Sequence, residues 1–305
     1  MSEVLEIIKS VIYGIVQGIT EWLPISSTGH LILVEQLIPF ENTSEGFFNM
    51  FDVVIQLGSI LAVVVLFWHQ IWPFYKKDSA KSKAMLVKDR KDPALGGYAL
   101  SMDAFWMWVK IVVACLPAVV YGLVLDDVVE ELFERTLPGR GVTVKVIVVA
   151  VMLALVGALF IIIENKNKGR TPRINSLSEI TFQAALFIGV CQLAAAALPG
   201  TSRSGATILG AILIGVSRTT AAEFTFFLAI PVMFGASLLK VIKFGFDFTA
   251  QELVLLLVGT AAAFVVSLFV LRFLMSYIKK HDFKAFGWYR IILGILVLAY
   301  FGFMA

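Results

Sequence analysis

The sequence predicts an all-α, polytopic membrane protein made of two inverted-topology repeats. The 305 residues are 59% hydrophobic and 15% charged, whereas soluble domains are about 25% charged. The apolar residues also fall in charge-poor blocks and do not alternate with polar ones, which argues against a membrane β-barrel. A third observation, two apolar regions that are interrupted in the same way, predicts the repeats.

Six blocks approach the ~20 residues that a helix needs to cross a bilayer. We expect three membrane-spanning helices in each half of the chain, at residues 53–68, 105–125, 144–163, 224–242, 253–275 and 286–304. The last block begins beside "GWYR" at 287–290, which we interpret as an interfacial aromatic belt on a lipid-facing span.

Two further regions are apolar but broken. Residues 4–38 are interrupted at "EWLPISSTGH" and residues 179–216 at "ALPGTSRSGAT". Proline lacks an N–H donor, and the residue before it avoids helical geometry. Irregular backbone at membrane depth is tolerated only where protein or water covers it. We therefore predict that each region is a re-entrant hairpin, which enters and leaves the membrane on the same side.

The two broken regions resemble each other in the order of their residues. Each half would then have one re-entrant hairpin and three membrane crossings. Because three is an odd number, the second half must be inverted relative to the first, an arrangement that many transporters share. We predict one integral membrane domain with repeats at about 1–177 and 178–305. The matching segments are Gly14-x-x-Gln17, Leu23-Pro24 and Ser26-Ser27-Thr28-Gly29 in the first half, and Gly189-x-x-Gln192, Leu198-Pro199 and Ser202-Arg203-Ser204-Gly205 in the second.

Lysine and arginine orient the predicted topology. They concentrate in loops 73–104, 165–178 and 279–284, while Arg135 and Arg140 lie among acids in the loop at 126–140. The positive-inside rule places the basic loops in the cytoplasm. Both termini are then expected outside. We interpret loop 73–104 as solvated, with contact to anionic lipids as the alternative.

The second break has the composition of an anion site. In "PGTSRSGAT", residues 199–207, Gly200 lets the backbone approach a ligand. Ser202 or Ser204 can cap the following helix, whose N-terminus attracts anions. Arg203 carries a planar fork suited to phosphate. An arginine in lipid costs about 2.5–3.5 kcal/mol or more, so its alternative role is a structural pair with Glu21 or Glu223.

The first break offers a carboxylate, hydroxyls and an imidazole. Gln17 and Glu21 share a helix face. Ser26 is the expected N-cap of a helix at 27–38, which leaves Ser27 as the freer hydroxyl. His30 lies three residues later on the same face, and a hydroxyl beside an imidazole is a minimal activated nucleophile. Glu21 could orient His30, act as acid or base, or hold a divalent cation. The alternative is capping of a broken helix.

Together, the two breaks offer a nucleophile with a base and an arginine with an anion cradle. This combination suits phosphoryl transfer, in which positioning and charge stabilisation dominate. A transporter or lipid flippase is the alternative, because broken helices and inverted repeats also occur in transporters.

These residues resemble the undecaprenyl-diphosphate phosphatase family, bacterial membrane enzymes linked to bacitracin resistance. The motifs are Gln17-x-x-x-Glu21 and Pro199-Gly200-x-Ser202-Arg203-Ser204-x-x-Thr207, with "LPISSTGH" and "VIQLGSILAVVV" matching as well. The resemblance implies removal of the terminal phosphate from a long-chain polyprenyl diphosphate at the cytoplasmic membrane, in recycling of the cell-wall lipid carrier. It also implies an Mg²⁺ or Ca²⁺ requirement, an outward-opening site and a possible homodimer. No nucleic-acid partner is expected.

The resemblance also implies roles for individual residues. Catalytic roles fall on Glu21, Ser27, His30 and Arg203, with Glu21 as the candidate metal ligand. Contacts to the phosphates are expected from Gln17, Ser26, Thr28, Gly200, Ser202, Ser204 and Thr207.

Overall fold

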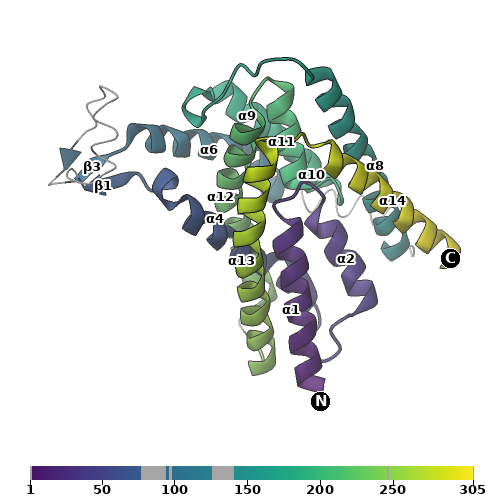
Figure 1. Cartoon of the computed structure of the whole chain (residues 1–305). Coiled ribbons are helices and arrows are strands. Elements are labelled where there is room, and N and C mark those ends of the chain that lie inside the picture. Colours follow the sequence, from purple (N-terminus) through teal and green to yellow (C-terminus); the bar gives the residue numbers. More distant parts are fainter. Residues whose placement is uncertain (1, 77–93, 96–97, 126–140, 246, 305) are drawn as a thin grey trace.

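The protein is a multi-pass helical membrane protein. A computed structural model describes every residue except 1, 77–93, 96–97, 126–140, 246 and 305 (Figure 1). Five described segments are long and apolar enough to cross a membrane, and they match five of the six predicted blocks. They are Phe47–Ile71, Met102–Val124, Val146–Asn167, Arg218–Phe244 and Ala250–Ile278. The sixth block lies within helix α14, Lys284–Met304.

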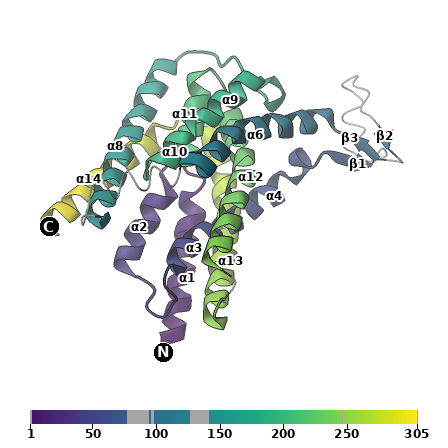
Figure 2. The same cartoon turned by 180° about the vertical axis from the view of Figure 1, so that it is seen from behind.

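Each broken region forms a helical hairpin. Helix α1 (Ser2–Thr20) turns at residues 21–26 and returns through α2 (Ser27–Leu37). In the second half, α9 (Phe182–Cys191) and the short α10 (Leu193–Ala197) return through α11 (Arg203–Leu213). Figures 1 and 2 show both hairpins with their tips near each other at the centre of the molecule. The predicted chain breaks are confirmed at both positions.

The two returning helices begin in the same way. Their N-caps, Ser26 and Ser202, have φ angles of 77° and 72°, and they are the only non-glycine residues with positive φ in the described part of the chain. Each side chain accepts a hydrogen bond from the N–H three residues ahead, from Gly29 at 3.3 Å and from Gly205 at 3.1 Å. The predicted Ser26 cap is confirmed, and Ser202 caps the second helix in preference to Ser204. A left-handed serine is strained, so the surrounding contacts must hold it.

Each hairpin packs against a long helix from the other half. Helix α1 lies along α13 (Ala250–Ile278), and α9 lies along α6 (Met102–Val120). Close approach depends on glycine in both cases, because an added Cβ at Gly14 would collide with the α13 backbone at Gly259, and one at Gly189 would collide with the α6 backbone at Ala114.

The remaining long helices complete the bundle. Helix α8 (Gly141–Asn167) pairs with α14, and α12 (Arg218–Phe244) runs through the centre against α3 (Phe47–Val54) and α4 (Gln56–Ile71). The N-terminal half of α12 is almost wholly buried and contributes three fully covered phenylalanines to the core, Phe224, Phe226 and Phe227. A π-helical turn, η1 (Tyr121–Leu125), extends α6, and a 3₁₀ turn, η2 (Leu177–Glu179), precedes α9.

Hydrogen bonds define the two ends of the bundle. At one end, Glu164 accepts from Arg218 and from the Phe283 N–H at 3.1 Å, while Lys284 Nζ reaches Asn165 at 3.4 Å. Loops 165–178 and 279–284 therefore leave the bundle at the same end, as the predicted topology requires. At the opposite end, Lys9 Nζ donates to the Pro39 carbonyl at 2.6 Å, close to the start of the chain.

The all-α prediction is confirmed, and one small sheet accompanies the helices. Strands β1 (Phe74–Lys76), β2 (Ala94–Leu95) and β3 (Tyr98–Leu100) pair antiparallel in the order β1-β3-β2, with Phe74 opposite Leu100. Strands of two or three residues are too short to show an alternating pattern in the sequence. They form part of the predicted basic loop 73–104, whose remaining lysines lie largely outside the described residues. The predicted acidic loop with Arg135 and Arg140 also lies outside them.

Candidate functional site: a polar pocket between the two hairpins

The hairpin tips meet at the carboxylate of Glu21. One of its oxygens, Oε1, accepts from Arg203 Nη2 at 2.8 Å across the hairpins. The other, Oε2, accepts from Ser27 Oγ at 2.8 Å and from Gln17 Nε2 at 3.0 Å. The carboxylate is 6% exposed, so water screens these contacts little. The predicted anion-site arginine therefore also has the structural partner that the sequence offered as the alternative.

Arg203, at the tip of the second hairpin, has one N–H donor group that is free to bind a phosphate. Arg203 Nη1 is buried and has no hydrogen-bond partner. A buried guanidinium donor without a partner costs free energy, and a phosphate oxygen would supply that partner. Ser204 Oγ donates to the main-chain carbonyl of Glu21 at 3.1 Å, which adds a second contact between the tips.

A cavity of about 360 Å³ opens beside these residues, between the hairpins, α6 and α12. The N-termini of α2 and α11 both border it through their first residues, Ser27 and Arg203. The first N–H groups of a helix have no intrahelical partner and favour anions. The polar side chains that line the cavity are those of Glu21, Ser27, Thr28, Gln56, Gln192, Ser202, Arg203 and Ser204, and Gly200 contributes backbone.

The expected contact between Ser27 and His30 does not form. His30 Nδ1 lies 2.7 Å from the Ser26 carbonyl oxygen, and Nε2 lies 2.7 Å from the Tyr289 hydroxyl on α14. Both ring nitrogens are thus engaged away from Ser27, whose hydroxyl turns to Glu21 instead. The i, i+3 spacing places two side chains on one face but does not decide toward which neighbour each one turns.

Three residues that were expected to contact the phosphates do not line the cavity. Ser26 Oγ is used as a helix cap. Gln17 is fully buried and supports Glu21. Thr207 Oγ1 donates within its own helix to the Arg203 carbonyl at 2.9 Å and accepts from Thr225 at 3.0 Å. None of the three lines the pocket, and Ser26 and Thr207 support the site from behind it.

Two glutamines at the pocket were not predicted as site residues. Gln192 occupies the position in the second repeat that Gln17 occupies in the first, and it donates to the Ala114 carbonyl at 3.0 Å. Its Oε1 is buried without a partner, as is that of Gln17. Gln56 begins α4 and lies in the "VIQL" stretch. The repeat comparison was the signal that could have found Gln192.

Arg290 corrects the interpretation of the C-terminal helix. The "GWYR" stretch was expected to face lipid, and Trp288 and Tyr289 are indeed 56% and 44% exposed, but Arg290 is 0% exposed. Its Nη1 donates to the Pro24 carbonyl at 3.0 Å, and its Nη2 donates to those of Gly200 and Thr201 at 2.8 and 2.9 Å. One guanidinium therefore ties both chain breaks together. A charged residue within an otherwise apolar span was the sequence signal for it.

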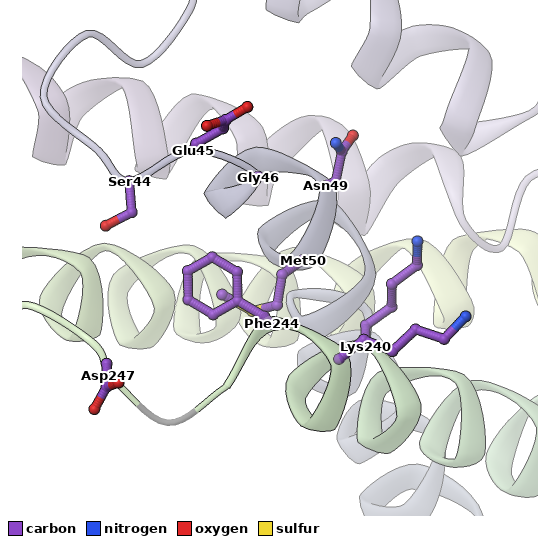
Figure 3. A pocket seen from close by; sticks show the side chains of 9 residues that line it. Ser44, Glu45, Gly46, Asn49, Met50, Lys240, Phe244 and Asp247 are labelled. Atoms are coloured by element: carbon purple, nitrogen blue, oxygen red, sulfur yellow. The ribbon is translucent and has the colours of Figure 1, made fainter.

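A second hollow lies farther along α12, toward its C-terminus. Figure 3 shows its lining, with Glu45 and Asn49 on one side and Lys240 on the other. Its two lysines, Lys240 and Lys243, are balanced by two acids, and both lysines are exposed. The lining of this hollow lacks the buried guanidinium donor of the first pocket, which we therefore take as the functional site.

Comparison with known proteins agrees with this assignment. The family model "Bacitracin resistance protein BacA" matches residues 10–296. The chain belongs to this family. Similar proteins include "Undecaprenyl-diphosphatase" of Desulfitobacterium hafniense, 56% identical over 97% of this chain and 96% of the relative. The enzyme of the same name from Enterococcus faecalis is 54% identical over 96% of both chains. "Undecaprenyl-diphosphatase 1" of Clostridium acetobutylicum is 53% identical over 98% of both.

The BacA-family site has one place where a divalent cation fits. Within the described residues, no three His, Cys, Asp or Glu side chains cluster as a metal cage. Glu21 is the single carboxylate at the pocket, and the orphaned Gln17 Oε1 lies on the same helix face. Mg²⁺ is commonly held by one or two carboxylates together with substrate phosphates. The donor set therefore fits a cation that arrives with a diphosphate, and not a preformed protein site.

Replacing Arg290 should destabilise the fold of this BacA-family chain. Arg290→Ala leaves three buried carbonyls at the chain breaks without a donor, and loss of such charge-assisted bonds costs about 3–5 kcal/mol. We expect a large drop in the melting temperature in detergent, with loss of activity. The matched control is Arg272→Ala, since Arg272 is exposed on α13, and it should melt like the unchanged protein. Equal melting temperatures for Arg290→Ala and the control would contradict the bridging role.

Proposed function

We propose that this protein hydrolyses undecaprenyl diphosphate to undecaprenyl phosphate and inorganic phosphate, and so recycles the lipid carrier of cell-wall synthesis in the bacterial cytoplasmic membrane. Relatives about half identical over nearly the full length bear the name of this activity. The observation that carries the proposal is the contact of Ser27 Oγ with Glu21 Oε2, beside an arginine with a free donor. No observation favours the flippase alternative.

Ser27 is the nucleophile in the proposed reaction. Its Oγ attacks the terminal phosphorus while Glu21 accepts the hydroxyl proton, and the bond from that phosphorus to the bridging oxygen breaks. Undecaprenyl phosphate leaves. A water molecule then attacks the phosphoserine, Ser27 regains its proton from Glu21, and inorganic phosphate departs with one proton released. Glu21 takes the place that the sequence offered to His30 because it is the group within hydrogen-bond reach.

Arg203 and the two helix N-termini stabilise the charge of the transferred phosphoryl group. Nη2 of Arg203 is held by Glu21, which aims the free Nη1. The N-termini of α2 and α11 contribute N–H donors and the positive ends of their dipoles. Such preorganised donors are effective because they need no rearrangement when charge develops. Thr28, Ser202 and Ser204 surround the same cavity and offer further hydroxyls.

Removal of the nucleophile or of the arginine should abolish phosphate release. We expect Ser27→Ala and Arg203→Ala to lower the rate by ~10³-fold or more, since an arginine that stabilises a transferred phosphoryl group contributes about 10³–10⁵. Phosphate release from a prenyl diphosphate by purified protein in detergent measures this.

Ser276→Ala is the control for this experiment, because Ser276 is exposed and bonds within its own helix. It should retain full activity. Full activity in Ser27→Ala would assign the attack to another hydroxyl or to water.

We also propose that the activity requires Mg²⁺ or Ca²⁺, which Glu21, and Gln17 through its Oε1, would hold together with the diphosphate of the substrate. The cation would supply charge neutralisation on the phosphate oxygens. The unpartnered Gln17 oxygen and the single carboxylate support a weak, substrate-assisted site.

A second carboxylate should tighten this cation site. Gln17→Glu places one on the same helix face as Glu21, and two carboxylates bind hard divalent cations better than one. We expect the variant to reach half-maximal activity at a lower Mg²⁺ concentration than the unchanged protein, after both are stripped with chelator. Gln251→Glu, on α13 away from the pocket, is the control and should show no change. An unchanged Mg²⁺ dependence in Gln17→Glu would remove residue 17 from the cation site.

The chain consists, we propose, of two inverted repeats with re-entrant hairpins and an outward-opening site. The exchange of packing partners supports the repeat: α1 lies on α13 and α9 on α6, at the glycines that matched in sequence. Loops 165–178 and 279–284, which are basic and leave the bundle at the same end, support its orientation. Along α12, Ala236 of the pocket and Lys240 of the separate second hollow are one turn apart, and both lie toward the end of α12 that is away from those loops.

Two single cysteines test this orientation. Glu45 and Lys280 are both exposed and lie at opposite ends of the bundle. In intact cells, an impermeant thiol reagent should label Glu45→Cys, and it should label Lys280→Cys only after permeabilisation. The unchanged protein, with half-buried Cys115 and Cys191, gives the background. The reverse labelling pattern would invert the proposed topology.

A further inference from the structure

The pocket has an apolar end that the phosphate chemistry does not use. Apart from the polar side chains and the Pro199–Gly200 turn, its lining consists of small or aliphatic residues from three helices. They are Ala118 of α6, Ala195 and Ala196 of α10, and Val232, Met233 and Ala236 of α12. We call these six residues the alanine groove. Four of the six are alanines, and their small side chains leave space in the pocket that larger side chains would fill.

Two prolines shape the helices beside the groove. Pro117 and Pro231 lie inside α6 and α12, each directly before a groove residue. Proline removes a helical hydrogen bond and bends the helix, and α6 passes into a π-helical turn shortly afterwards. The helices are thus shaped to leave space at this end of the pocket.

The groove reaches the surface that faces lipid. Ala196 and Ala236 are exposed although they line the pocket. Their surroundings on α6 and α12 are large apolar side chains that are more than half exposed, among them Leu116, Val120, Phe234 and Leu238. In helices of membrane-spanning length and composition, such a surface contacts acyl chains. The pocket therefore reaches the surface that faces lipid, at Ala196 and Ala236.

We infer that the exposed edge of the alanine groove, at Ala196 and Ala236, holds the prenyl chain where it leaves the pocket and guides it into the bilayer between α6, α10 and α12. This inference rests on the proposed function. The cavity of about 360 Å³ is at the small end of ligand pockets, about 300–1,000 Å³. It has room for a diphosphate and a short apolar segment, and the remainder of a long chain must leave it. The groove is the apolar exit continuous with the phosphate end.

Filling the groove should separate long substrates from short ones. We expect Ala236→Trp and Ala196→Trp to lower kcat/KM for a long-chain prenyl diphosphate by about tenfold or more, the scale of a lost or blocked apolar contact. Hydrolysis of a short, water-soluble prenyl diphosphate should stay within about twofold, because its chain ends inside the pocket. Ala261→Trp, at an exposed alanine on α13 outside the pocket, is the matched control and should change neither rate.

The two substrates distinguish failure of the groove from failure of the proposed function. If the unchanged protein releases phosphate from neither substrate, the proposed function fails. If the groove variants hydrolyse the long-chain substrate normally, or lose both substrates equally while melting like the control, the groove does not hold the chain.

A smaller substitution at residue 236 gives a second test that does not require the fold to accommodate a tryptophan. Ala236→Cys can be modified with a lipid-soluble maleimide, with the unchanged protein as background for the natural cysteines. Long-chain prenyl monophosphate should protect the new cysteine, and inorganic diphosphate should not. Equal modification with and without the prenyl monophosphate would also overturn the inference.

Discussion

The site depends on the ion pair between Glu21 and Arg203, the only one among the described residues that links the two hairpin tips. A carboxylate and a guanidinium at membrane depth are each costly alone, and each makes the other tolerable. The pair also does more than neutralise charge. It fixes one oxygen of Glu21 so that the other is presented to Ser27, and it occupies one nitrogen of Arg203 while leaving the other free. Nucleophile, base and phosphate donor are therefore placed by a single contact.

The ion pair needs two chain breaks to be held in register, and polar main-chain groups at such breaks require partners in an apolar environment. Arg290 meets this requirement for both breaks at once, because it reaches Pro24 in the first and Gly200 and Thr201 in the second. Ser26 and Ser202 satisfy the N–H groups of the helices that follow. The α14 helix, which is remote in sequence from both hairpins, therefore fastens the tips together.

The two hairpins have the same geometry and different chemistry. Ser27 and Arg203 are each the first residue of an eleven-residue helix that follows a left-handed serine cap. Equivalent positions thus present the nucleophile from one side of the pocket and the phosphate ligand from the other. A pair of facing helix N-termini favours an anion whatever the side chains are. Because one helix begins with a serine and the other with an arginine, this anion site can also react with the anion that it binds.

The sequence alone determined the membrane class, five of the spans by composition, both chain breaks, and the Ser26 cap, because these depend on local hydropathy and on what proline and serine do to neighbouring backbone. It also placed Glu21, Ser27 and Arg203 at the tips, where their polarity is exceptional. The tertiary structure decided which hydrogen-bond partners these side chains have. Ser27 turned to Glu21 and His30 to Tyr289, a residue 259 positions away, and spacing along one helix carries no information about such a neighbour. For the same reason Arg290 became a site residue only in the folded chain, where a guanidinium from the last helix meets carbonyls from two distant breaks.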